Sequence, residues 1–248
     1  YVSIHPTFDR RETCVKYSRT EIVEDVRRLQ HPIARQLLLD RGISGVELVS
    51  TADIPSGTGL STSSAYTVGV IHALNAFEGK YASQEKIAAQ ACEVEIDKLG
   101  EPIGKQDQYG TAVGGMKFIR FLPDETVEVE PVLMRPGTRR ELEESLLLFY
   151  TGLTHSAGEI LKEQGANVVS EQKKFESMVR MTELAREMRQ SLTEGDLNRF
   201  GEILNENWLL KRELASGVSN GTVDHYYDIA MRSGALGGKL LGAGGGGF

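Results

Sequence analysis

The sequence has 248 residues, of which 40% are hydrophobic and 25% are charged, as in an ordinary globular protein. Its net charge of −7 argues against a broad surface for nucleic acid or anionic membrane, and no apolar stretch approaches the roughly 18 residues of a membrane span. Two cysteines and five histidines, scattered without ligand spacing, argue against a disulfide framework or a zinc centre and favour the reducing cytoplasm.

Apolar periodicity predicts the elements of the first half of the chain. Strands are expected over residues 1–7 and 13–17, followed by a helix over 24–40 that is interrupted or begun again at Pro32. Val46–Ser50 alternates like a half-buried strand, and the next helix is expected over 65–77. Ser83 is a suitable N-cap for a helix that runs to Leu99 and ends at Gly100.

The second half begins with strands and continues with helices. Paired strands are expected over 116–121 and 126–132, and the apolar run 146–150 is expected to form a buried strand. Long helices follow over 171–192, 197–214 and 222–232, and Gly237–Leu241 could form a short closing strand. Strands followed by helices favour an α+β fold, with a boundary within 131–138.

A run of glycines and hydroxyl residues, Pro55–Ala65, separates the strand at 46–50 from the helix at 65–77. Gly57 and Gly59 let backbone N–H groups approach a ligand closely, and a helix that begins there adds unpaired amides and a partial positive charge. The run therefore suits an anion such as a nucleotide phosphate. The alternative is an ordinary serine N-cap on a buried helix.

Three segments together resemble one family, the GHMP kinases (galacto-, homoserine, mevalonate and phosphomevalonate kinases). Pro55–Ala65 resembles its phosphate loop, Gly104–Gln108 the segment around its active-site aspartate, and Gly238–Gly247 its C-terminal glycine motif. Within the family, the segments Gly104–Tyr109 and Phe149–Gly152 and the helix around Trp208 look most like the heptose 7-phosphate kinase branch.

The resemblance implies a two-domain fold. We expect an N-terminal nucleotide-binding domain over 1–135, similar to domain 2 of ribosomal protein S5, and a ferredoxin-like C-terminal domain over 136–248. The family's first motif is absent and its last strand would be incomplete, so the sequence is expected to lack both termini. Ser61 and Thr62 stand where Gly-Ser is more usual, a change that keeps one hydroxyl.

Helical geometry singles out Glu95 among the carboxylates. Ala88, Cys92, Glu95 and Leu99 share one face of the helix over 84–99, so Glu95 points where the helix should pack. A buried carboxylate is costly unless it is paired or binds a cation. A structural salt bridge is one interpretation; the resemblance implies the other, a magnesium ligand, because the family's metal-binding glutamate stands about twelve residues before its aspartate.

By resemblance, Asp107 accepts or orients the proton of the attacking hydroxyl; the alternative is an aspartate in a loop or a helix cap. Phosphoryl transfer asks a protein mainly for alignment and charge neutralisation. Thr151–Ser156 is polar and follows the expected strand at 146–150, which suits substrate contacts.

We therefore expect an ATP- and Mg²⁺-dependent kinase of a sugar or sugar phosphate, with heptose 7-phosphate as the first candidate. A kinase of another alcohol, such as galactose, fucose or mevalonate, and a non-catalytic binding protein with the same fold remain alternatives. We expect a small-molecule partner, no nucleic acid or membrane, and leave a homodimer open. The expected site has Asp107 as the catalytic residue, Ser63 and Glu95 as metal ligands, Pro55, Gly57, Gly59, Leu60, Ser61, Thr62, Ser63 and Ser64 around ATP, and Thr154, Gly242, Ala243, Gly244 and Gly245 around substrate and phosphate.

Overall fold

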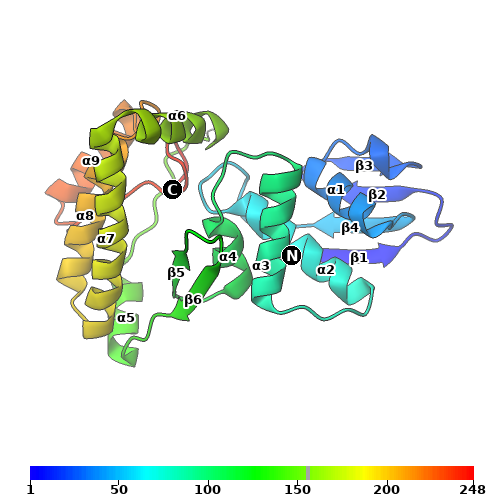
Figure 1. Ribbon diagram of the computed structural model, residues 1–248, viewed down its shortest axis with the longest axis horizontal. Coiled ribbons are helices and arrows are strands. Elements are labelled where there is room, and N and C mark those ends of the chain that lie inside the picture. The colour runs from blue at the N-terminus through cyan, green and yellow to red at the C-terminus, as the bar shows by residue number, and fades with distance from the viewer. Residues whose placement is uncertain (155–156) are drawn as a thin grey trace. The chain divides into compact units, whose positions relative to one another are not determined.

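The computed structural model describes residues 1–154 and 157–248, and its internal contacts divide them into two units (Figure 1). Unit 1 consists of Tyr1–Ser56 and Ser61–Gly114, and unit 2 consists of Gly57–Leu60 and Gly115–Phe248. The division into two family domains at residues 135 and 136 stays a prediction.

A four-stranded sheet forms one layer of unit 1. The strands are β1 (Val2–Pro6), β2 (Thr13–Lys16), β3 (Thr20–Val23) and β4 (Val46–Ser50), in the order β1-β4-β2-β3. β4 pairs antiparallel with β1 and parallel with β2, while β2 and β3 form an antiparallel hairpin. The sequence predicted β1, β2 and β4 and missed β3, which lies within four residues of its partner.

Helices cover one face of this sheet. Val15, Val46 and Leu48 of the sheet join one core with apolar side chains of α1 (Pro32–Arg41), α2 (Thr62–Phe77) and α3 (Gln84–Cys92). The helix predicted over 24–40 is shorter than expected: only a 3₁₀ turn, η1 (Val26–Arg28), precedes α1, which begins at Pro32. Proline is tolerated at the first helical position because its missing N–H would have no partner there.

The end of α3 departs from α-helical geometry. α3 continues into a π-helical segment, η2 (Glu93–Lys98), whose wider turn buries Val94 and Glu95 together and leaves Glu93 exposed. Such π-helical segments frequently lie at functional sites. A further helix, α4 (Gln106–Val113), follows and contains Asp107 and Gln108, where the sequence suggested only a loop or a helix cap.

Unit 2 begins with a two-stranded hairpin of β5 (Lys117–Phe121) and β6 (Val127–Pro131), paired antiparallel as predicted. Arg189 attaches the hairpin to a helix: its guanidinium lies 4.8 Å from the centre of the Phe118 ring and donates to Glu130 at 2.7 Å.

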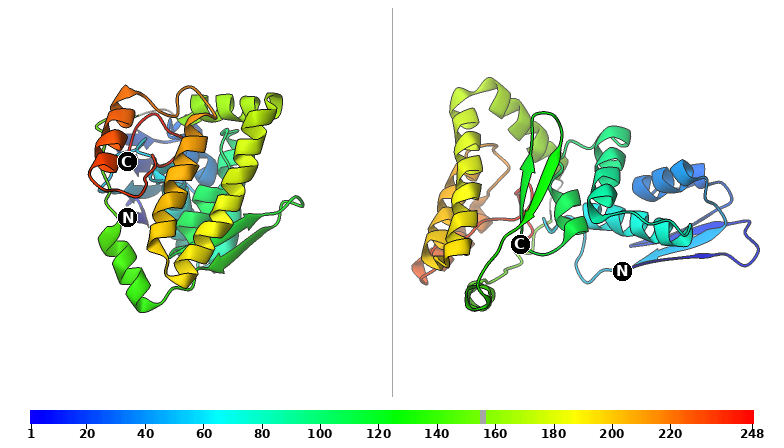
Figure 2. Two further views of the ribbon diagram at one scale, coloured as in Figure 1. Left: turned by 90° about the vertical axis from the view of Figure 1, so that its left-hand side faces the viewer. Right: turned by 60° about the horizontal axis from the view of Figure 1, so that its bottom comes forward.

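Helices make up the rest of unit 2, with α7 and α8 side by side in both views (Figures 1 and 2). Gly195 ends α7 in the left-handed conformation, and Asp196 caps α8 by accepting the N–H of Arg199 at 2.9 Å. Trp208 is fully buried, as predicted, in a second core with Ile160, Val218 and Leu240. The helices are α5 (Pro136–Ser145), α6 (Ala157–Ser170), α7 (Gln172–Glu194), α8 (Leu197–Arg212) and α9 (Gly221–Arg232).

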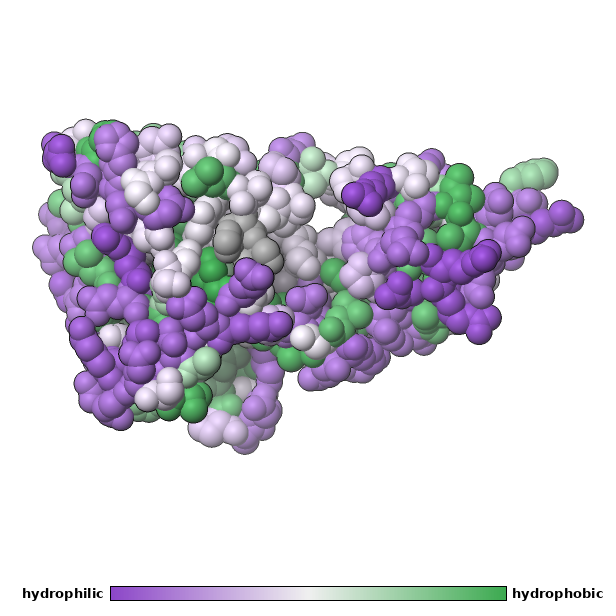
Figure 3. Space-filling view, turned by 90° about the horizontal axis from the view of Figure 1, so that it is seen from above, coloured by the Kyte–Doolittle hydropathy of each residue, from purple (hydrophilic) through white to green (hydrophobic). Residues whose placement is uncertain are grey.

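Two predicted strands are wrong. Residues 146–150 form no strand, and their side chains are between 47% and 77% exposed. Residues 237–241 form no strand either. Within the described residues neither segment pairs with a strand, and an apolar run alone does not form a ladder. On the face displayed in Figure 3, apolar residues are interspersed among polar ones. None of the described helices is long and apolar enough to cross a membrane.

Candidate active site

The first turn of α2 presents three hydroxyl residues, Thr62, Ser63 and Ser64. The N–H groups of this turn have no partners within the helix, so they carry the partial positive charge of a helix N-terminus. The N-cap, Ser61, has φ +54° and makes no side-chain capping bond. A left-handed conformation costs a non-glycine residue free energy, whereas glycine adopts it readily.

Glu95 lies beside this turn and is only 1% exposed. Its Oε1 accepts hydrogen bonds from Ser63 Oγ at 2.8 Å and Thr67 Oγ1 at 2.9 Å. Its Oε2 accepts from Ser64 Oγ at 2.8 Å and Gln108 Nε2 at 2.5 Å. The structure thus brings Ser63 and Glu95 together.

All four groups that donate to Glu95 are uncharged, and within the described residues this carboxylate has no ion pair. The structural salt bridge considered from the sequence is therefore not formed there. A buried carboxylate without a countercharge is costly, so the donor set fits a cation bound at Oε1 and at the exposed Ser63 hydroxyl.

The donors are carboxylate and hydroxyl oxygens, which suit Mg²⁺ and also Mn²⁺. Among the described residues there is no cluster of three or more histidine, cysteine, aspartate or glutamate side chains that could hold a metal. Mg²⁺ needs no such cage: it is commonly bound through one or two protein oxygens, with water and substrate phosphates completing its coordination.

Asp107 lies in the first turn of α4 and is half-buried. Within the part of the chain that the structure describes, its carboxylate makes no hydrogen bond or ion pair. A negative side chain is favourable in the first turn of a helix. The side chain of Asp107 is therefore held on α4 with no hydrogen-bonding or ion-pairing role among the described residues.

Sequence reasoning missed Gln108 as a site residue. Its side chain is fully buried, and α4 thereby contributes one of the four donors to Glu95. The available signal was its position directly after Asp107, in a segment already singled out.

The loop Gly57–Leu60 packs within unit 2 against the C-terminal glycine motif. A Cβ on Gly59 would come within 2.6 Å of the carbonyl oxygen of Leu241, and the N–H of Phe248 donates to the carbonyl of Thr58 at 3.2 Å. Backbones approach this closely only where glycine removes the side chain. This contact accounts for Gly59 and Gly242, whereas Gly244 and Gly246 approach the backbones of Val218 and Leu153.

Other residues expected around substrate are placed as follows. Gly242 accepts a hydrogen bond from the buried Lys211, and Ala243 packs against the core around Trp208. The N–H of Gly245 donates to the carbonyl of Val218 at 3.0 Å, so this amide already has a hydrogen-bond acceptor within the protein. Thr154 is exposed, and residues 155 and 156 lie outside the described residues.

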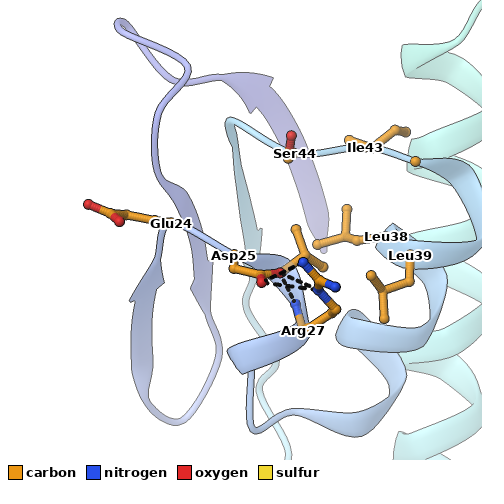
Figure 4. Close-up of a pocket in the computed structure, with 9 residues that line it drawn as sticks. Glu24, Asp25, Arg27, Leu38, Leu39, Ile43 and Ser44 are labelled. Carbon is orange, nitrogen blue, oxygen red and sulfur yellow. Dashed lines mark hydrogen bonds and ion pairs between the residues drawn. The ribbon is translucent and has the colours of Figure 1, made fainter.

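Unit 1 contains a hollow of about 490 Å³, which is lined by residues such as Arg27, Leu38 and Ile43 (Figure 4). Arg27 there pairs with Asp25, a neighbour in the chain, at 3.0 Å. Among the described residues that line this hollow there is no predicted site residue.

Comparison with known proteins identifies the family. The model of the GHMP kinase N-terminal domain matches residues 25–115, and the model of the GHMP kinase C-terminal domain matches residues 188–248, together more than half of the chain. The chain belongs to the GHMP kinase family. The resemblance drawn from the three glycine-rich and aspartate segments is confirmed.

Individual relatives include sugar kinases. The chain is 34% identical over 197 residues to D-glycero-alpha-D-manno-heptose 7-phosphate kinase of Campylobacter jejuni, covering 79% of this chain and 58% of that protein. It is 33% identical to a bifunctional fucokinase/GDP-fucose pyrophosphorylase of Arabidopsis thaliana, covering 83% of this chain and 20% of that protein. The chain therefore spans less than two thirds of the length of these relatives.

A solved structure is also similar. The crystal structure of a D-glycero-D-manno-heptose 1-phosphate kinase from Bacteroides thetaiotaomicron superposes with a TM-score of 0.75 at 25% identity, covering 98% of this chain and 73% of that one. The chain therefore has the GHMP kinase fold.

Proposed function

We propose that this protein transfers the γ-phosphoryl group of ATP to a hydroxyl of a sugar phosphate, in a reaction that depends on Mg²⁺. The observation that carries the proposal is the buried Glu95 carboxylate, which lies against Ser63 on the first turn of the helix after the glycine loop and has no countercharge among the described residues. Family membership supplies the reaction class.

The phosphate and the cation are proposed to be bound by different groups of residues. The amides of the continuous segment 57–64 bind phosphate oxygens, as unpaired N–H groups at a glycine-rich helix start do. Ser63 Oγ and Glu95 Oε1 would hold the cation, which would supply neutralisation of the charge that develops during phosphoryl transfer.

Asp107 acts on the acceptor. Its carboxylate accepts the proton of the attacking hydroxyl, or orients that hydroxyl in line with the phosphorus atom, which contributes much of the rate enhancement in such reactions. Its freedom from hydrogen bonds and ion pairs within the described residues leaves it available for this role. Thr154 and residues 242–245 are proposed to contact the acceptor and the transferred phosphate.

Heptose 7-phosphate is the first candidate for the acceptor, supported by the likeness to a heptose 7-phosphate kinase at 34% identity. Fucose, galactose or mevalonate as acceptor would require the same Ser63, Glu95 and Asp107, so these residues do not separate the candidates. A non-catalytic binding protein is the second class. The presence of Asp107 counts against it, because binding alone does not need a proton acceptor.

The test is ATP consumption by the purified protein with a panel of acceptors. It contains heptose 7-phosphate, heptose 1-phosphate, galactose, fucose and mevalonate, each with and without Mg²⁺. We expect Mg²⁺-dependent turnover that is highest with the heptose 7-phosphate. Turnover only with mevalonate or an unphosphorylated sugar would assign the protein the related kinase activity instead. No turnover with any acceptor would favour the non-catalytic binding protein.

A cytoplasmic location and a homodimer also stay proposals, checked by cell fractionation and analytical ultracentrifugation.

A further inference from the structure

The two polar atoms of the Gln108 side-chain amide, Nε2 and Oε1, differ in their hydrogen bonding. Its Nε2 donates to Glu95 Oε2 at 2.5 Å, whereas its Oε1 is buried and has no hydrogen-bond partner in the part of the chain that the structure describes. The whole residue is 0% exposed. A buried carbonyl oxygen without a donor costs free energy, and such groups are rare enough in native proteins to call for an explanation.

The orientation of this amide follows from its neighbour. Turning the amide over would place its carbonyl oxygen against a carboxylate oxygen at 2.5 Å, where two acceptors repel. The N–H must therefore face Glu95, and the unpartnered oxygen must face elsewhere. Gln108 Oε1 therefore lacks a partner because Nε2 of the same amide must face Glu95.

Gln108 differs from the other three donors to Glu95 in two ways. Ser63, Ser64 and Thr67 all come from α2, and their hydroxyls rotate and accept as well as donate. The amide N–H of Gln108 comes from α4 and only donates. It therefore fixes Oε2 in space, while Oε1 keeps the two rotatable partners, Ser63 and Thr67.

This asymmetry suits the arrival of a cation on the Oε1 side. Thr67 Oγ1 has a second acceptor, the carbonyl oxygen of Ser63 at 3.1 Å, and the Ser63 hydroxyl turns freely because Ser63 is exposed. Both protons can leave Oε1 while Ser64 and Gln108 still hold Oε2. Mg²⁺ usually keeps several water molecules, each of which needs an acceptor.

We propose that Gln108 is a positioning residue for the metal. Its N–H holds the Glu95 carboxylate with Oε1 toward Ser63, and its unpartnered Oε1 accepts a hydrogen bond from a water molecule on the cation. The inference rests on the proposed function. Because Gln108 follows Asp107 in the first turn of α4, one turn of helix positions both the metal ligand and the residue that addresses the acceptor.

The test compares Gln108→Leu with Gln90→Leu. Leucine is similar in size to glutamine but has neither the donor nor the acceptor. Gln90 is a matched control, since its Oε1 is also buried without a partner and it makes no hydrogen bond to Glu95. Mn²⁺ is titrated into each protein, alone and with a non-hydrolysable ATP analogue, and free Mn²⁺ is followed by electron paramagnetic resonance.

We expect Gln108→Leu to weaken Mn²⁺ binding about 10–100-fold, the usual effect of removing a partner of a metal ligand, and Gln90→Leu to leave it unchanged. Wild-type affinity in Gln108→Leu overturns this inference even if turnover falls. If the wild-type protein binds no Mn²⁺, the proposed metal site fails and this inference fails with it. The two failures are therefore distinguishable.

Gln108→Asn keeps the inference falsifiable if Gln108→Leu does not fold. This change keeps the amide donor and acceptor but shortens the side chain by one methylene group, so the N–H from α4 no longer reaches Glu95 Oε2. Mn²⁺ binding should weaken in this variant too, and wild-type Mn²⁺ affinity in Gln108→Asn would contradict the positioning role.

Discussion

The variant Glu95→Gln tests whether the Glu95 carboxylate is a metal ligand or a structural group. The amide can keep every hydrogen bond: its oxygen accepts from Ser64 and Gln108, and its N–H₂ group donates to Ser63 and Thr67, whose hydroxyls rotate. Four charge-assisted bonds of ~2 kcal/mol each become neutral bonds of ~1 kcal/mol, a loss of about 4 kcal/mol. Relief of the carboxylate's desolvation returns several kcal/mol, so the metal-free variant should lie within about 1 kcal/mol of the wild type.

The same change should abolish stabilisation by the metal. A ligand at a hundred times its dissociation constant adds about 2.7 kcal/mol, which corresponds to a rise in Tm of roughly 5–10 °C for a protein of this size. Calorimetry with Mg²⁺ and an ATP analogue should show this rise in the wild type and less than about 2 °C in Glu95→Gln.

Glu93→Gln is the control, because Glu93 lies on the same π-helical segment, is exposed and pairs with Lys98 at 2.8 Å. It should keep the full rise in Tm. A Glu95→Gln variant that unfolds, or loses more than about 3 kcal/mol without metal, would show that the carboxylate is structural. A full metal-induced rise in that variant would remove Glu95 from the metal site.

Three further predictions concern single substitutions elsewhere in the chain. Asp107→Asn should lower kcat about a hundredfold or more with little change in nucleotide affinity, measured by steady-state kinetics; near-normal turnover would make the aspartate structural. Ser61→Gly should raise the free energy of unfolding by about 1 kcal/mol, because φ is +54° and no capping bond is lost; denaturant titration would contradict this if stability fell. Burial lowers the pKa of His31 while the Glu21 charge opposes the shift. The folded protein then binds fewer protons, so stability is complete above the unfolded pKa of about 6.5 and is lost as the pH falls toward the folded pKa. His31→Asn, which keeps a capping side chain, should flatten the pH profile of Tm in that window; an unchanged profile would contradict the assignment.

The sequence predicted well where a local pattern decides the structure. Alternation located β1, β2 and β4, and helical periodicity located α2, α7 and α9. Glu95 was found because a carboxylate on an apolar helix face is conspicuous, and the structure buries it.

What the sequence did not predict depends on contacts between distant segments. The π-helical segment around Glu95 and the amide of Gln108 are recognisable only once α2, α3 and α4 are packed together. The strand predicted over 146–150 fails because strand formation requires a partner, which an apolar run cannot specify. Ser61 was noted as an unusual residue, but only its backbone angle gives the physical reason.

The central claim is that Glu95 and Ser63 hold the divalent cation of a kinase. The most direct measurement is a crystal structure of the protein with Mn²⁺ and a non-hydrolysable ATP analogue, in which anomalous scattering locates the ion. The account predicts one anomalous peak about 2.0–2.2 Å from an oxygen of Glu95 and from Ser63 Oγ, with the Ser63 hydroxyl no longer donating to Glu95. A peak elsewhere, with the hydrogen bond from Ser63 to Glu95 still at its present 2.8 Å, would contradict it.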